Sequence, residues 1–267
     1  MAFDITRLET ELTGYLRSSA GNTATVGGRE ITLFDDPLFA YASAEDPLFQ
    51  RYKDPSVIGP HFRLPEEWLP GAKTVISVFF PFSDAVRKSN TGERGLPGEA
   101  WLFGRVEGQA FINGFSERFV SLLVQEGFTA VSPSVSEDFW SVSAPSEPEE
   151  LSFTSNWSER HVAFAAGMGT FGLSKGIITR RGMAGRFTSV ITTWETSPTE
   201  REYTDVYEWC IRCGACVRRC PGHAISLEHG KDHSVCLEYQ KSIIGQLRPR
   251  FGCGMCQTEV PCESRRP

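Results

Sequence analysis

The sequence predicts an α+β fold that ends in a small cysteine-rich module, within a chain of 267 residues. Three observations lead to this prediction. Helical and strand patterns mix along the first part of the chain without the regular strand–helix alternation of a parallel sheet. A near-continuous apolar run at 74–80 is typical of a buried strand. The eight cysteines all follow residue 209, which separates a larger domain, 1–200, from a smaller one, 201–267.

The first third of the chain predicts one helix, one irregular stretch and one strand. Apolar residues recur at helical spacing over 4–18, so we expect a helix there. Residues 21–71 carry repeated Gly and Pro turn signals together with several aromatic side chains. Disordered chains are poor in aromatics, so we expect an irregular but ordered wrap over a core or a pocket. Residues 74–80 then form the central strand of the sheet.

The middle of the chain alternates loops with one long helix. Residues 84–99 are polar and rich in glycine, which predicts a loop. Apolar side chains between 111 and 123 recur at helical spacing, and Gly127 is placed to end that helix. A short strand at 128–131 follows. The Ser-, Pro- and Glu-rich residues 132–150 predict a second loop, placed to act as a lid.

The next segment carries a helix start and then two strands. Asn156 is a candidate N-cap, and Glu159 stands three residues later as in a capping box. Small residues follow up to Gly167 and leave room for another backbone or a ligand. Strands are expected at 177–179 and 187–193, on either side of a glycine turn.

The cysteine spacing is the strongest chemical signal. The first run reads C-x2-C-x2-C-x3-C-P, which is the bacterial ferredoxin pattern. Eight thiolates are the number that two 4Fe–4S clusters need. A zinc site does not call for the third and fourth cysteines of this run, and a disulfide scaffold would spread its cysteines through a small secreted domain. The predicted ligands are Cys210, Cys213, Cys216, Cys220, Cys236, Cys253, Cys256 and Cys262.

The ferredoxin rule also predicts how these ligands are shared. The first three cysteines of a run bind one cluster together with a remote fourth, and the fourth cysteine of the run binds the other cluster. The first expected set is Cys210, Cys213, Cys216 and Cys262. The second expected set is Cys220, Cys236, Cys253 and Cys256. Arg212, Arg218 and Arg219 lie among them; charge compensation is the favoured interpretation, and a docking patch for an acidic electron donor is the alternative.

Composition narrows the remaining function classes. The chain is 40% hydrophobic and 22% charged, and its net charge of −6 argues against a broad nucleic-acid footprint. No apolar run approaches the roughly 18 residues of a membrane span, and the N-terminus lacks a signal-peptide pattern. We therefore expect a cytoplasmic protein without a membrane partner.

A glycine-rich segment, Gly167-Met-Gly-Thr-Phe-Gly172, matches G-x-G-x-x-G literally. The dinucleotide fingerprint follows a strand and opens a helix, whereas this segment follows a predicted helix and leads into a strand. Two interpretations stay open. One is a helix end that needs positive φ and tight packing; the other is a loop close to a large planar cofactor.

Two segments together with the cysteine order resemble one family. Asn156 to Lys175 resembles the E-[RK]-x-L-A-x-x-A-G-L-G-W-I-G-K-N segment of epoxyqueuosine reductases, and residues 69–78 resemble their L-P-G-A-K-S-V-I-V strand. The cysteine order also resembles that of reductive dehalogenases. The resemblance implies a nitroreductase-like N-terminal domain with a mixed sheet, a base-off cobalamin, and two 4Fe–4S clusters in a ferredoxin-like C-terminal domain.

The resemblance also implies site residues. A corrinoid would lie over one segment of the chain, and the protein would hold, orient and insulate it. The residues implied are Arg160, Gly167, Gly169, Phe171, Gly172 and Lys175. The family's catalytic Asp falls on Phe153 here, so no catalytic residue is assigned, and nearby Glu149 and Glu150 are candidate substitutes. This departure argues against epoxyqueuosine as the substrate, and the acidic net charge argues against tRNA.

The predicted function is a corrinoid-dependent reductase of a small-molecule substrate. Its electrons would come from an external low-potential donor such as a ferredoxin or a flavodoxin. Two alternatives come from other classes: an electron-transfer protein without a substrate of its own, and a tRNA epoxyqueuosine reductase. A flavin is the alternative occupant of the pocket.

Overall fold

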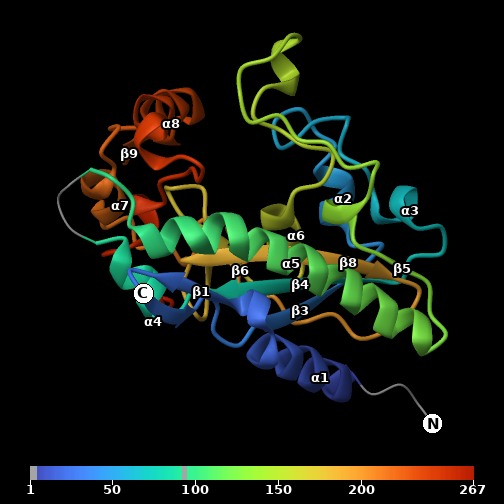
Figure 1. Ribbon diagram of the computed structural model, residues 1–267. Coiled ribbons are helices and arrows are strands. Elements are labelled where there is room, and N and C mark those ends of the chain that lie inside the picture. The colour runs from blue at the N-terminus through green and yellow to red at the C-terminus, as the bar shows by residue number, and fades with distance from the viewer. Residues whose placement is uncertain (1–4, 92–94) are drawn as a thin grey trace.

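A four-stranded antiparallel sheet forms the centre of the molecule, as shown by a computed structural model that describes residues 5–91 and 95–267 (Figure 1). The strand order is β3 (Leu38–Ser43), β4 (Thr74–Pro81), β8 (Gly185–Thr192) and β5 (Ala130–Val131). Every neighbouring pair is antiparallel, so the expected mixed sheet is wrong. The α+β class itself is confirmed.

The two faces of β4 pack against different layers, which explains why its apolar run is continuous. Ile76 and Val78 belong to a core with α1 (Ile5–Ser18) and α5 (Glu99–Gln125). Val75 and Phe79 belong to a second core with α6 (Glu159–Ala165). Because neither face meets solvent, strand alternation gives no polar positions here.

Several elements of the structure agree with the elements that the sequence predicts. The helix at 4–18 is confirmed as α1, although residue 4 lies outside the described residues. Strands expected at 128–131, 177–179 and 187–193 are confirmed as β5, β7 (Ile177–Thr179) and β8. Helix α6 is followed by the glycine-rich segment, as expected, and the short strand β6 (Gly169–Phe171) lies within that segment.

Residues 21–71 are more regular than their turn signals suggested. They contain the hairpin β1 (Thr23–Val26) and β2 (Arg29–Thr32), the edge strand β3, and the short helices α2 (Pro47–Arg51) and α3 (Pro65–Trp68). The turn residues end these short elements without excluding them. The prediction of an irregular wrap is therefore wrong for β3, which pairs with β4 along its full length.

The polar stretch at 84–99 is also not a simple loop. It contains α4 (Asp84–Ser89), capped by the Ser83 hydroxyl, which accepts from the Val86 amide. The long helix α5 begins at Glu99, within residues that glycine made look non-helical. Gly104 and Gly108 lie inside this helix, where no larger residue fits. A Cβ would lie 2.6 Å from the Phe82 ring at Gly104 and 2.7 Å from the Phe34 ring at Gly108.

Replacing Gly108 with alanine should therefore destabilise the fold by about 1–3 kcal/mol, because the added methyl collides with the Phe34 ring. Gly114, further along the same helix, is the matched control, since no atom lies within 4 Å of its added Cβ. Gly114→Ala should stabilise by about 0.5–1 kcal/mol through helix propensity. Urea unfolding of both variants measures the difference, and a stabilised G108A would contradict this packing.

The start of α6 differs from the predicted capping box. Ser158 occupies the N-cap position. The Asn156 side chain instead accepts from the Trp140 amide at 3.1 Å and donates to the Asp138 carbonyl at 2.8 Å. It therefore joins the start of α6 to the loop that precedes it, and Glu159 is left inside the molecule.

The cysteine-rich segment packs onto the sheet domain. Its elements are α7 (Ala215–Arg219), β9 (Ile225–Ser226), β10 (Gly230–Lys231), α8 (His233–Leu247) and the turn η4 (Met255–Gln257). Trp209 and Val260 belong to the same core as α6. Residues on both sides of position 200 thus share one core, and the division into two domains stays a prediction. None of the described helices is both long and apolar enough to cross a membrane.

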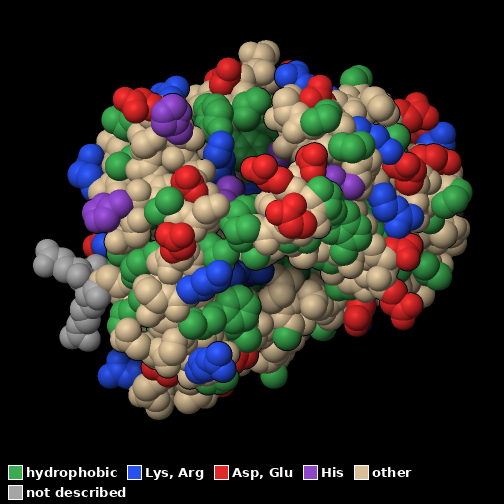
Figure 2. Space-filling model, turned by 90° about the horizontal axis from the view of Figure 1, so that it is seen from above, with side chains coloured by type: hydrophobic (Ala, Val, Ile, Leu, Met, Phe, Trp, Pro, Cys, Tyr) green, Lys and Arg blue, Asp and Glu red, His purple; other side chains and the backbone are tan. Residues whose placement is uncertain are grey.

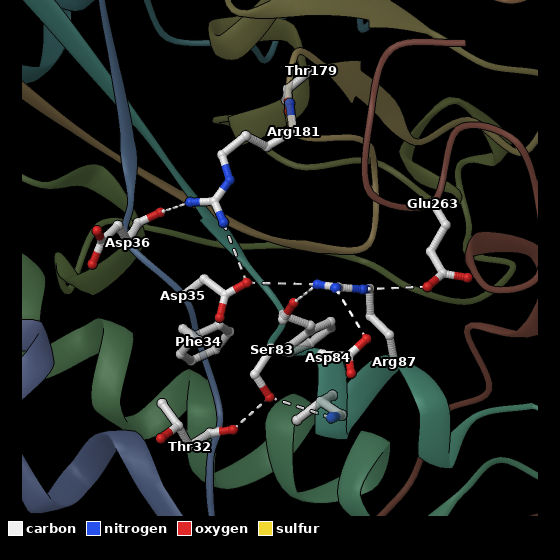
Figure 3. Close-up of polar contacts among 12 residues, drawn as sticks. Thr32, Phe34, Asp35, Asp36, Ser83, Asp84, Arg87, Thr179, Arg181 and Glu263 are labelled. Carbon is white, nitrogen blue, oxygen red and sulfur yellow. Dashed lines mark hydrogen bonds and ion pairs between the residues drawn. The ribbon is translucent and has the colours of Figure 1, made fainter.

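An arginine network fixes the segment that follows the last cysteine (Figure 3). Arg87 from α4 lies 3.3 Å from the Glu263 carboxylate and 3.7 Å from that of Asp35. Arg181 reaches the same Asp35 carboxylate at 3.2 Å. The Glu263 carbonyl also accepts from the Ala184 amide at 3.0 Å. Residues distant in sequence therefore hold Cys262 in place, and Arg181 serves this network.

Candidate functional site: two cysteine cavities and a cationic hollow

The eight cysteines line two separate cavities, four in each. One cavity is lined by Cys210, Cys213, Cys216 and Cys262. The other is lined by Cys220, Cys236, Cys253 and Cys256. The structure thus brings together the same two sets that the spacing predicts. We call them the first and the second cysteine set.

Each set contains a turn that only glycine adopts easily. Gly214 has φ of 70° and precedes α7, and Gly254 has φ of 72° and precedes η4. A Cβ on Gly254 would also lie 2.0 Å from the Trp101 ring. These left-handed residues follow Cys213 and Cys253 directly, so each chain segment turns sharply around its cavity.

Neighbouring thiols raise the pKa of Cys262 in the first set and of Cys253 in the second. Burial, followed by the neighbouring thiols Cys216 and Cys210, raises the pKa of Cys262 to about 12. Burial, followed by Cys256 and Cys236, raises the pKa of Cys253 to about 12. Crowded buried thiols disfavour thiolates unless a cationic group neutralises them, which is what iron does.

Each cavity is ringed by four thiols, an arrangement that fits a 4Fe–4S cluster. Within residues 5–91 and 95–267, no three His, Cys, Asp or Glu side chains are arranged to hold a single metal ion. The two sets approach each other where α7 packs against η4. Cys216 and Cys256 lie near each other across this junction, since the Cys256 thiol contributes to the raised pKa of Cys216.

Cations surround the second set. Its cavity is also lined by Arg105, Arg186 and Lys231, and none of the described lining residues is an Asp or a Glu. Burial, and then the charges of Arg105 and Arg160, lower the pKa of Arg186 to about 9. The Arg186 Nε donates to the Gln109 side-chain oxygen at 2.8 Å, which fixes the guanidinium without neutralising it.

The same cationic region continues toward α8. Burial lowers the pKa of His233 to about 4, and the charges of Lys231, Arg160 and Lys175 contribute to this shift. The Arg160 guanidinium donates to the Lys175 carbonyl at 2.8 Å. Figure 2 shows Lys, Arg and His side chains inside a hollow in this face of the molecule, with Asp and Glu side chains on its rim. We call this region the cationic hollow.

A lid spans the hollow. The loop between β5 and α6 reaches α8, where the Phe153 ring stacks on His233 with centroids 5.6 Å apart. Phe153 has φ of 54°, which is rare for a residue with a side chain. His61 supports the lid, with its Nε2 2.8 Å from the Thr154 hydroxyl. Glu149 and Glu150 lie exposed on the same loop, in the turn η3 (Glu149–Leu151).

The implied corrinoid residues fall into two groups. Arg160 and Lys175 belong to the cationic hollow. Gly167, Gly169 and Phe171 lie within the protein, where the chain's own packing explains the glycines. Gly167 has φ of 79° at the end of α6, and a Cβ on Gly169 would lie 2.0 Å from the Ile178 carbonyl oxygen.

Phe171 and Gly172 complete the hairpin of β6 and β7. A Cβ on Gly172 would lie 3.4 Å from the Ile178 side chain, which is ordinary contact. The Phe171 ring packs against the His161 ring, with the two ring centroids 5.0 Å apart. Burial lowers the pKa of His161 to about 3, so this ring is neutral and belongs to the packing.

Glu159 is a buried carboxyl that the sequence presented only as a helix cap. Neither of its oxygens makes a hydrogen bond of ordinary geometry within the described part of the chain. Burial raises its pKa to about 7, and the hydroxyls of Ser189 and Ser134 oppose part of this shift. The side chain therefore holds a proton close to neutral pH. No local sequence signal distinguishes it from an ordinary capping glutamate.

Replacing Glu159 with glutamine should stabilise the protein at pH 8 by about 2–3 kcal/mol and change little at pH 4.5. A carboxyl whose folded pKa is raised contributes most below its unfolded pKa, and that contribution is lost as the pH rises through the folded value near 7. Anaerobic urea unfolding at both pH values measures the effect. An equal change at both would show that Glu159 does not titrate in this window.

Comparisons with known proteins agree with this geometry. Residues 203–226 match the family described as a 4Fe-4S binding domain, and this match contains the whole first cysteine run. Epoxyqueuosine reductase from Bacillus subtilis superposes with a TM-score of 0.54 at 17% identity, over 98% of this chain and 67% of that chain. The enzyme from Streptococcus thermophilus superposes with a TM-score of 0.56 at 13% identity, over 99% of this chain and 68% of that chain. This chain shares their fold.

The same fold occurs in a second group of reductases. The catabolic reductive dehalogenase NpRdhA, in complex with 3-bromo-4-hydroxybenzoic acid, gives a TM-score of 0.53 at 14% identity. That match covers 98% of this chain but 37% of the dehalogenase. The chain thus spans about two thirds of the epoxyqueuosine reductases and a smaller part of the dehalogenase. No curated protein sequence matches it significantly. The recognition of this reductase fold from the sequence is confirmed.

Proposed function

We propose that this protein is an iron–sulfur oxidoreductase that carries electrons from an external donor through two 4Fe–4S clusters to a corrinoid in the cationic hollow. The reaction would be the reductive cleavage of a bond in a small-molecule substrate. The observation that carries the proposal is the placement of the second cysteine set, whose cavity is also lined by Arg105 and Arg186 of the sheet domain.

The residues of the hollow fit a large polar cofactor. Arg160 and Lys175 offer donors toward the amide and phosphate groups that a corrinoid carries, and Arg186 adds a third cation. Bound there, a corrinoid would supply low-valent cobalt for reductive bond cleavage. The lid residue Phe153 offers an apolar roof that limits the access of water. Phe153 also brings no acid to this position, so any proton must come from another group or from water.

The cysteines and the cations around them have different roles in this proposal. The thiols hold the clusters, and the packing of α7 against η4 keeps the two sets adjacent. The cations around the second set stabilise an extra electron there, because positive charge nearby favours the reduced cluster. The likeness to epoxyqueuosine reductases and to NpRdhA supports the reductase class. A small molecule rather than tRNA is proposed because the net charge is −6.

Adding cobalamin to the anaerobic, cluster-loaded protein should give the EPR spectrum of base-off Co(II). Iron and sulfide analysis of the same sample establishes that both clusters are present. A visible spectrum before addition reveals a flavin if one was retained from expression. If cobalamin leaves the EPR spectrum of an intact two-cluster protein unchanged, the corrinoid proposal is wrong, and a flavin enzyme or an electron-transfer protein replaces it.

A further inference from the structure

One face of the cysteine-rich segment combines an exposed cysteine with exposed apolar and cationic side chains. Cys213 is the only one of the eight cysteines that is exposed; the other seven are partly covered. Ile211 is 58% exposed and Leu227 is 50% exposed, which makes both unusual for large apolar residues. We call the surface formed by Ile211, Arg212, Cys213, Arg218 and Leu227 the Cys213 face.

The members of this face lie together in space. Arg212 donates to the Leu227 carbonyl at 3.0 Å, and Arg218 donates to the Cys213 carbonyl at 3.3 Å. The position of a Cβ on Gly214 lies 3.5 Å from Leu227 and 3.3 Å from Arg218. The face is therefore one continuous patch over the first cysteine set.

The two arginines of the face keep their charge available. Their hydrogen bonds go to backbone carbonyls, and neither makes an ion pair with a carboxylate in the described part of the chain. Arg219, the third arginine of the run, differs. It pairs with Glu259 at 2.8 Å and donates to the Asn90 carbonyl, so it is structural. Charge compensation inside the fold thus explains Arg219 but not Arg212 and Arg218.

No cysteine of the second set is exposed, although the exposed Phe251 lies close to Cys253 in the sequence. The cavity of this set is walled by Trp101, Phe82 and Arg105 from the sheet domain, and Cys253 and Cys256 are partly covered. A carrier that must approach closely can therefore reach the first set through the exposed Cys213, whereas all four cysteines of the second set are partly covered. Cys216 then lies near Cys256, which gives a path inward.

We propose that the Cys213 face is the docking surface for an acidic one-electron carrier, such as a flavodoxin. Exposed apolar residues at the centre and unpaired arginines beside them are the composition of a transient electron-transfer interface. Glu228 adjoins the face beside Leu227, and the two arginines leave the face net positive on a chain of net charge −6. Such a local cationic patch steers an acidic partner toward the exposed cluster edge.

The step at this face is a single electron transfer. The reduced carrier is oxidised by one electron, and the cluster of the first set is reduced by one electron, without transfer of a proton. This inference rests on the clusters of the proposed function. It requires neither the corrinoid nor the substrate, so its test remains valid if the corrinoid proposal fails.

The test is anaerobic stopped-flow reduction of the oxidised two-cluster protein by flavodoxin hydroquinone. The variant Arg212→Glu/Arg218→Glu should react about 10-fold or more slowly than wild type at low ionic strength. This difference should largely disappear at about 1 M salt, where charges are screened beyond about 3 Å. The milder variant Arg212→Gln/Arg218→Gln should lie between the two.

The matched control is Arg7→Glu/Arg29→Glu, which reverses two exposed charges outside the cysteine-rich segment, in α1 and β2. It should react at the wild-type rate. The extent of reduction by dithionite shows that each variant keeps both clusters. An unchanged rate in the arginine-to-glutamate variant, or an equal fall in the control, would overturn the proposed docking surface.

Discussion

Replacing Cys236 with alanine should remove about half of the iron and leave one 4Fe–4S cluster per chain. Cys236 lines the second cavity, with Cys220, Cys253 and Cys256. A cluster that loses one of four thiolates loses a quarter of its protein ligands, and burial raises the pKa of the remaining Cys253 thiol, which favours its protonated form. Iron and sulfide analysis and the EPR spectrum of the reduced protein measure the loss.

Cys262→Ala is the matched variant, because Cys262 belongs to the first set. It should lose the same amount of iron but the other cluster. The two single variants should therefore give different EPR spectra, and the interaction between two reduced clusters should be absent from both. If C236A and C262A lost the same cluster, the division of the ligands into these two sets would be wrong.

The second large effect is expected at Arg160. Replacing it with glutamine should weaken cobalamin binding about 10- to 100-fold, because a charge-assisted hydrogen bond contributes about 1.5–3 kcal/mol. The Arg160 guanidinium donates to the Lys175 carbonyl and has no carboxylate partner in the described residues, so its charge is available to a ligand. Titration of the base-off Co(II) EPR signal measures the affinity.

Arg180 provides the control for this substitution. It lies in the turn after β7, is exposed, and pairs with Glu202 away from the hollow. Arg180→Gln should leave cobalamin affinity unchanged, and iron content should stay constant in both variants. Wild-type affinity in the Arg160 variant would show that the ligand occupies another surface, and an equal loss in both variants would point to a general effect of charge.

The prediction of the sheet shows where local patterns are reliable. The apolar run of β4 predicted a buried strand, since a strand covered on both faces needs apolar side chains at nearly every position. β3 was missed because its neighbours carry turn residues, and its pairing partner β4 begins only at Thr74, in a different part of the sequence. The glycines of α5 were misleading for a related reason. Gly108 makes room for Phe34, which no local window contains.

The lid gives a second example. Its composition predicted a loop, and the structure has one. The contact between Phe153 and His233 joins residues that are far apart in the chain, so no spacing rule reports it. The same is true of Arg87 and Glu263, whose ion pair fixes the segment beyond Cys262.

The two predicted ligand sets and the iron–sulfur chemistry expected of them follow from the amino-acid order alone, because cluster ligation depends on residue type and on short, fixed spacings. The buried central strand and the α+β class follow from it as well. The folded structure was needed to establish which cysteine is exposed, why Glu159 keeps a proton near neutral pH, and which arginines remain without acidic partners. Those properties depend on burial and on charges brought together from separate segments, and a local pattern contains neither.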